Sequence, residues 1–149
     1  MEPLIDGVIL TDLKIIPAEN GRVMHGLKAT ESSYNGFGEA YFSSVGKGKV
    51  KGWKQHLEMT LNLIVPVGTI RFVIYDDRAD SKTYKTFNEF YLGPEEKYSR
   101  LTITPGLWMA FQGVGEDLNL LLNIASIPHD PAEVIQLPQE NDQIPNYNW

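Results

Sequence analysis

Apolar and polar residues alternate with a period of two along most of the chain, and helical periodicity is scarce. This alternation is typical of strands, whose side chains point to opposite faces in turn. The pattern predicts about eight short strands, and spacing of this kind indicates an all-β jelly roll or barrel. The predicted strands cover residues 8–16, 36–44, 59–65, 69–75, 87–92, 100–103, 107–112 and 119–126.

Proline and glycine mark the predicted boundaries. We expect Pro17 to end the first strand and Pro105-Gly106 to form a tight turn, since Pro presets φ and Gly accepts positive φ. From Pro128 onward, prolines and polar residues predict a tail that wraps around the domain and forms no strand. No linker or internal repeat interrupts the pattern, so we expect one domain over residues 1–149.

Composition narrows the classes of function. The chain has 149 residues, a formal net charge of −6 and no cysteine. The negative charge argues against general nucleic-acid binding, and the lack of cysteine excludes disulfides and thiol catalysis. The acidic first ten residues do not follow the signal-peptide pattern, and no apolar stretch reaches the roughly 20 residues of a membrane helix. We therefore expect a cytoplasmic protein that does not bind membranes.

Titratable side chains gather at residues 49–58, directly before a predicted buried strand. His56 is a candidate base, because histidine titrates near neutrality, and Lys54 stands beside it. Tyr41 and Tyr75 lie on predicted strands and are candidate proton donors, although each also fits a core or rim position. Glu58 lies on the same strand face as His56, a weak signal for a metal site.

Basic and amide side chains suggest a ligand site. Lys51 and Arg71 are candidate donors to a diphosphate, although a solvated basic strand is the commoner meaning of such a run. Asparagines interrupt the apolar strands and either line a polar cavity or face solvent. These asparagines are Asn62, Asn119 and Asn123.

Similarity to a known family extends over about residues 35–149. It rests on the order of the segments GFGEAYFS, KVKGW, PVGTIRFVIYDDR, LTITPGLWMAF, SIPHDPAEV and IPNYNW. In these segments the chain resembles the dTDP-4-dehydrorhamnose 3,5-epimerases, which are cupin-type jelly rolls of nucleotide-sugar biosynthesis. The resemblance implies a homodimer and a reaction without metal or cofactor.

The resemblance also implies a mechanism. A histidine removes the proton next to a 4-keto group, a tyrosine returns one from the opposite face, and a lysine supports the enolate. Lys54 falls at the position of that histidine, and His56 lies two residues later on the same strand face. The expected tyrosine falls near Leu122 or Asn123, and Lys51 matches a phosphate-binding arginine.

The leading hypothesis is therefore a metal-free epimerase or isomerase acting on a 4-keto-6-deoxy sugar nucleotide. Two alternatives remain open: a non-catalytic cupin that binds a sugar or nucleotide, and a metal-dependent cupin enzyme that uses His56 and Glu58. For the leading hypothesis we expect His56 as base, Lys54 beside it, and Tyr75 or else Tyr41 as acid. The expected substrate-binding residues are Lys51, Arg71, Glu39, Trp53, Asn62, Trp108 and Asn123.

Overall fold

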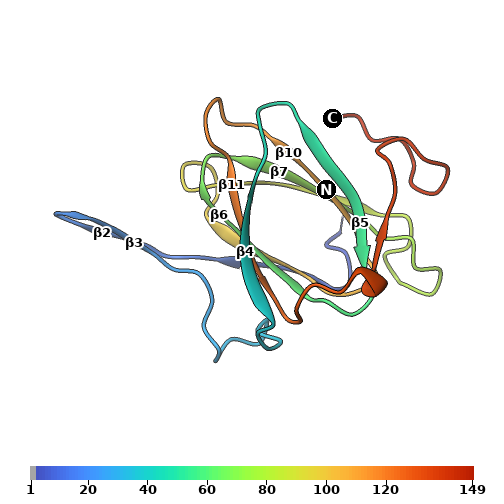
Figure 1. Ribbon diagram of the computed structural model, residues 1–149, viewed down its shortest axis with the longest axis horizontal. Coiled ribbons are helices and arrows are strands. Elements are labelled where there is room, and N and C mark those ends of the chain that lie inside the picture. Colours follow the sequence, from blue (N-terminus) through green and yellow to red (C-terminus); the bar gives the residue numbers. More distant parts are fainter. Residues whose placement is uncertain (1–2) are drawn as a thin grey trace.

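Two five-stranded antiparallel sheets pack into a sandwich in the computed structural model, which describes residues 3–149 (Figure 1). The first sheet has the order β1 (Val8–Asp12), β9 (Ser99–Ile103), β6 (Leu61–Val67), β11 (Leu120–Ala125), β4 (Glu39–Ser44). The second has the order β12 (Val134–Gln136), β5 (Val50–His56), β10 (Trp108–Gly113), β7 (Ile70–Tyr75), β8 (Phe87–Leu92). The predicted all-β jelly roll is confirmed; Met1 and Glu2, included in the predicted domain, lie outside the described residues.

A hairpin of β2 (Ile15–Ala18) and β3 (Gly21–Met24) extends away from the sandwich (Figure 1). The sequence predicted one strand over residues 8–16 that Pro17 would end. This prediction is wrong, because Pro17 lies inside β2 opposite Arg22. A two-stranded ribbon has only edge strands, so a proline can keep its missing N–H on the unpaired side.

Alternation along β7 separates two apolar clusters. Ile70, Phe72 and Ile74 are fully buried in the main core between the sheets. Val73 and Tyr75 point to the opposite face of the same sheet, where they pack in a second cluster with Ile144 of the C-terminal segment. The tail therefore covers the outer face of this sheet, as the wrapping prediction requires.

The tail also contributes regular structure, contrary to the prediction. A 3-10 turn (Pro131–Glu133) leads into β12, which pairs with β5 along its open edge. The pairing continues in reciprocal backbone bonds between Trp53 and Leu137, at 2.9 and 3.0 Å. Tertiary pairing decides this strand, since its three residues are too short for a periodic signal.

Candidate active site

A cavity of about 340 Å³ lies between the two sheets. Its volume falls at the lower end of the range for small-molecule sites. One wall comes from β4, β6 and β11, and the other comes from β5 and β10. The lining residues are Tyr41, Ser43, Lys51, Gly52, Lys54, His56, Leu61, Leu63, Met109, Phe111, Leu121 and Asn123.

A β-bulge in β5 turns the basic residues into the cavity. Met109 pairs with Lys54 but Phe111 pairs with Lys51, so β5 contains one more residue than β10 between these two pairs. A bulge of this kind changes which face the following side chains occupy. Lys51 and Lys54, three residues apart, therefore both line the cavity, whereas strict alternation would separate them.

Glycine is required at the bulge. Gly52 has a φ of +136°, a conformation that side chains with a Cβ rarely adopt. A Cβ at this position would also lie 2.5 Å from the Cβ of Ala110 on the neighbouring strand. The close approach of β5 to β10, and with it the orientation of Lys51, depends on this glycine.

His56 is held by a buried carboxylate. Its Nδ1 lies 2.6 Å from Oε1 of Glu133, whose side chain is 2% exposed. The other oxygen of Glu133 accepts hydrogen bonds from the backbone N–H groups of Leu57, Glu58 and Met59, at 3.1–3.2 Å. With Nδ1 engaged by Glu133, Nε2 is the nitrogen of His56 that remains for chemistry in the cavity.

The electrostatics of the pair favour an ionised Glu133. Burial raises the pKa of this carboxyl, but the hydrogen bonds from His56 and from the backbone N–H groups of Glu58 and Met59 outweigh that effect. The resulting pKa is below the usual value. An ionised carboxylate at Nδ1 fixes the ring and accepts a hydrogen bond from Nδ1–H, so the neutral ring carries its proton on Nδ1 and Nε2 is left unprotonated to act as a base.

The opposite wall carries a tyrosine and an amide. Tyr41 of β4 lies directly opposite Asn123 of β11 in the strand register, and both line the cavity. The Nδ2 of Asn123 lies 3.0 Å from the phenol oxygen of Tyr41. The Oδ1 of the same amide accepts the backbone N–H of Asn62 at 3.2 Å.

Three aromatic residues expected at the site lie elsewhere. Trp53, Tyr75 and Trp108 pack in the second apolar cluster, on the outer face of the β5–β10–β7 sheet and away from the cavity lining. Burial raises the pKa of Tyr75, and the indole N–H of Trp108 donates to Asp77 at 2.9 Å. The two tryptophans and Tyr75 therefore hold the tail on the sheet.

Arg71, expected at the diphosphate, also points away from the cavity. Its guanidinium donates to Glu89, to Gln112 and to the backbone oxygen of Asn148. It also lies 5.2 Å from the ring centre of Trp149, within cation–π range. Arg71 thus anchors the C-terminus.

The other two expected residues flank the site. Asn62 is buried beside the cavity wall, where its amide oxygen accepts from Arg100 and Thr102. Glu39 lies two residues before Tyr41, so it shares the inward face of β4 but falls outside the lining. Asn119, which the sequence left as either a cavity or a surface residue, is buried and bonds the loops at Thr69 and Gly115.

Glu133 was missed by sequence reasoning. It lies in a polar, proline-containing segment where an acidic residue has no pattern that marks it as buried. The only signal was its place in the segment SIPHDPAEV, which carried part of the family resemblance. A carboxylate positioned by three backbone N–H groups becomes visible only when the tail is folded against the end of β5.

Two features of residues 3–149 bear on the expectations for metals and membranes. No group of three or more His, Cys, Asp or Glu side chains in this range is placed to hold a metal ion. Glu58, the expected companion of His56, is exposed beyond the end of β5. No helix in this range is long and apolar enough to cross a membrane.

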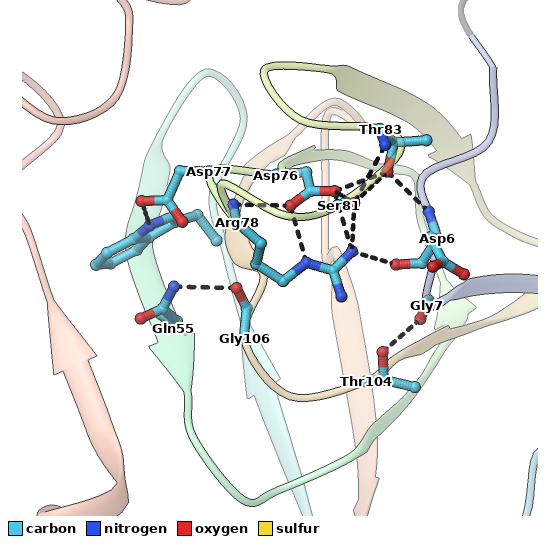
Figure 2. Close-up of polar contacts among 11 residues, drawn as sticks. Asp6, Gly7, Gln55, Asp76, Asp77, Arg78, Ser81, Thr83, Thr104 and Gly106 are labelled. Carbon is cyan, nitrogen blue, oxygen red and sulfur yellow. Dashed lines mark hydrogen bonds and ion pairs between the residues drawn. The ribbon is translucent and has the colours of Figure 1, made fainter.

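A second charged site lies in the loop after β7, and Figure 2 shows its contacts. Asp76 is fully buried and accepts hydrogen bonds from Arg78, Ser81 and Thr83; we call these four residues the loop cluster. Burial raises the pKa of Asp76, but these bonds outweigh it and hold the pKa far below its usual range. Arg78 also donates to the backbone oxygen of Asp6, which ties the N-terminal segment to the loop.

Comparisons with known proteins agree with this architecture. The chain is 30% identical over 130 residues to the probable low-salt glycan biosynthesis epimerase of Haloferax volcanii, covering 86% of this chain and 83% of that protein. It is 39% identical to the dTDP sugar isomerase of Desulfovibrio desulfuricans G20, with a TM-score of 0.91 and coverage of 95% and 90% of the two chains. The chain belongs to the family of dTDP-sugar epimerases and isomerases.

The same fold recurs in more distant structures. The dTDP-4-dehydrorhamnose 3,5-epimerase of Sulfolobus tokodaii matches with a TM-score of 0.79 and 24% identity, covering 91% of this chain and 80% of that one. No family model matches the chain. Membership in the dTDP-sugar epimerase family therefore rests on the pairwise relatives, and the resemblance drawn from the sequence is confirmed.

Proposed function

We propose that this member of the dTDP-sugar epimerase family is a nucleotide-sugar epimerase or isomerase that acts on a 4-keto-6-deoxy sugar nucleotide. The observation that carries the proposal is the His56–Glu133 pair at the cavity, with Nδ1 2.6 Å from the carboxylate. A histidine positioned in this way can take the proton from the carbon next to a ketone, while the carboxylate stabilises the imidazolium that forms.

Lys54 supports the charge that develops on the substrate. It shares the inward face of β5 with His56, and both line the cavity. When the proton leaves, negative charge moves to the keto oxygen, and a nearby ammonium group stabilises it. These two residues of β5 thus provide the base and the electrostatic support from one wall of the cavity.

Lys51 is the proposed contact to the diphosphate. The bulge at Gly52 turns its side chain to the cavity, where Nζ donates to the backbone oxygen of Ser44 at 2.7 Å. An ammonium group with a single neutral partner has donors left for phosphate oxygens. The solvent-exposed position suits the diphosphate, because a nucleotide sugar extends beyond the sugar subsite.

Proton exchange tests the proposal. The protein is incubated with dTDP-4-keto-6-deoxyglucose in heavy water, and deuterium at C3 and C5 is measured by NMR. We expect incorporation at one or both carbons, and His56→Asn should lower its rate by about 10³-fold, within the range for acid–base catalysis. His129→Asn is the matched control, because His129 is exposed and lies outside the lining.

Two outcomes would change the assignment. Binding of dTDP without exchange in any 4-keto sugar nucleotide would replace the enzyme by a non-catalytic sugar-nucleotide-binding cupin. Unchanged exchange in His56→Asn would move the role of the base to Lys54.

We also propose that the protein is a cytoplasmic homodimer. The hairpin β2–β3 supports the dimer, because it extends beyond the sandwich and exposes Val23 (57%) and Ile16 (46%) (Figure 1). Apolar residues on an extended arm are typical of a surface that a second chain covers. Light scattering after size exclusion should give twice the 16.8 kDa chain mass, and Val23→Glu should shift the protein toward the monomer; a wild-type monomer would contradict this.

A further inference from the structure

Tyr41 and Asn123 form a cross-strand pair on the cavity wall that faces β5. They stand directly opposite each other in the register of β4 and β11. Opposed residues on antiparallel strands have Cβ atoms about 5 Å apart and share one face of the sheet. The phenol of Tyr41 can therefore reach the space in front of β11, although Tyr41 and Asn123 are 82 residues apart in the sequence.

The amide of Asn123 has a fixed orientation. Its Oδ1 accepts the backbone N–H of Asn62, which can only donate, so Nδ2 must be the atom that faces Tyr41. The nearest other partner of Nδ2 is the weakly accepting sulfur of Met59, at 3.9 Å. Asn123 itself is 2% exposed, so water does not replace these partners.

This orientation determines what the phenol can do. Because Nδ2 donates to the phenol oxygen, the oxygen acts as acceptor and its own proton remains available to another group. Tyr41 lines the cavity and is 42% exposed as a residue, so its hydroxyl is accessible to a bound molecule. The same Nδ2–H would stabilise the oxygen after the proton has left.

We propose that Tyr41 is the catalytic acid that returns a proton to the substrate, and that Asn123 is the positioning residue that holds its oxygen. This inference rests on the proposed function. Tyr41 comes from the β4 sheet and His56 from the β5 sheet, on opposite walls of the cavity. A sugar ring between the walls meets the base on one face and the acid on the other, which is the requirement for inversion of a stereocentre.

The proton steps balance without a further reactant. Neutral His56 takes the proton of the carbon next to the ketone, and the C–H electron pair forms the enolate. The O–H bond of Tyr41 then breaks, its proton goes to the same carbon on the opposite face, and the enolate pair forms the new C–H bond. The imidazolium and the phenolate are left, and exchange with water restores both.

The assignment explains a difference from the family resemblance. The expected late-strand tyrosine falls near Leu122 or Asn123 of β11, and neither is a phenol. Asn123 points into the cavity from this strand, and Tyr41 supplies the phenol from the adjacent one. The proposed acid thus lies on β4, one strand away from the position that the resemblance implies. The amide of Asn123 lies near that position on β11.

Tyr41→Phe separates this proposal from the proposed function. In heavy water we expect the variant to keep deuterium exchange into recovered substrate within about tenfold of wild type, since His56 still removes the proton. Formation of the inverted product should fall by about 10²-fold or more. Tyr84→Phe is the matched control, because Tyr84 is an exposed tyrosine outside the cavity lining.

The outcomes distinguish the two claims. Product formation within threefold of wild type in Tyr41→Phe would overturn the acid role and leave the proposed function intact. Equal loss of exchange and product would also overturn it, because Tyr41 would then act in binding or in proton removal. Absence of exchange in the wild type would instead overturn the proposed function.

Asn123→Asp tests the positioning role. Aspartate keeps an oxygen for the N–H of Asn62 but replaces the donor to Tyr41 by a carboxylate oxygen. We expect product formation to fall about tenfold while exchange changes less, so the ratio of exchange to inversion rises. A purely structural role would lower both rates alike, and so would overturn this part of the proposal.

The double variant provides an independent check. If Asn123 acts through Tyr41, Asn123→Asp should add no further loss of product formation in a Tyr41→Phe background, since residues that act as a unit are not additive. Additive losses would overturn the coupling between the two residues.

Discussion

The loop cluster and the cavity both contain a buried carboxylate, but they use it differently. Asp76 accepts from three side chains within seven residues of itself, and the hydroxyl groups of Ser81 and Thr83 both donate to it (Figure 2). One oxygen of Glu133 accepts from the backbone, and the other contacts His56. The second ring nitrogen of His56 remains available to a ligand in the cavity. The site with more polar contacts to its carboxylate is therefore the structural one. The site where a ring nitrogen of His56 is left for a ligand is the chemical one.

This comparison bears on how charge clusters are interpreted. The loop cluster has the more strongly shifted carboxyl pKa of the two, yet its partners are local and it lies away from the cavity lining. Structural ion-pair networks shift pKa values as catalytic sites do. A polar group that lies next to a cavity and has no partner in the protein distinguishes a catalytic site from a structural ion-pair network.

Of the variants that test this comparison, one in the loop cluster should have the largest effect. Asp76→Asn should lower the free energy of unfolding by about 3 kcal/mol, because it removes a buried charge and leaves Arg78 without its partner. Guanidinium unfolding measures this loss. Turnover per folded molecule should stay at the wild-type level, since the cluster lies outside the cavity. Asp80→Asn, at an exposed neighbour, should change stability by less than about 0.5 kcal/mol.

Acid titration provides the check on this prediction. The pKa of Asp76 is lower in the folded protein than in the unfolded chain, so its stabilisation is complete above about pH 4 and is lost as pH falls below that value. Stability of the wild type should therefore fall more steeply in this range than that of Asp76→Asn. Parallel curves would contradict the structural role of the charge.

A second variant tests Glu133, whose carboxylate bonds both the backbone and His56. Glu133→Gln should lower the exchange rate by about 10²-fold, equivalent to about 2.7 kcal/mol, because the imidazolium loses its counter-charge. Stability should change by only about 1 kcal/mol, since the amide oxygen can still accept the backbone N–H groups. Glu58→Gln is the neighbouring control, and an exchange rate in Glu133→Gln equal to that control would remove Glu133 from the mechanism.

The smallest effect is expected at the mouth of the cavity. Lys51→Met should weaken dTDP binding about tenfold, the value of one charge-assisted hydrogen bond of about 1.4 kcal/mol. Titration calorimetry measures the change. Lys49→Met serves as the control, because Lys49 is exposed and lies outside the lining. Equal affinities for the two variants would show that the bulge at Gly52 does not direct Lys51 to the ligand.

The sequence predicted the fold and one side of the site. Period-two alternation located most strands, and His56 and Lys54 were placed on one face of β5 because two residues separate them. Arg71, Trp53, Trp108 and Tyr75 were also expected at the site, since aromatic and basic residues on strands are equally suited to a ligand or to a tail that packs on the sheet. The sequence contains no signal that distinguishes these two uses.

By itself, the sequence determined the all-β architecture, the family resemblance and the candidate base, because each depends on spacing within a short segment. Only the tertiary structure decided which strand faces which. It placed Glu133 against His56 across 77 residues, and it set Tyr41 against Asn123 across 82. It also turned Lys51 inward at a bulge. These relations depend on register between strands that are distant in the chain, and a single sequence does not specify that register.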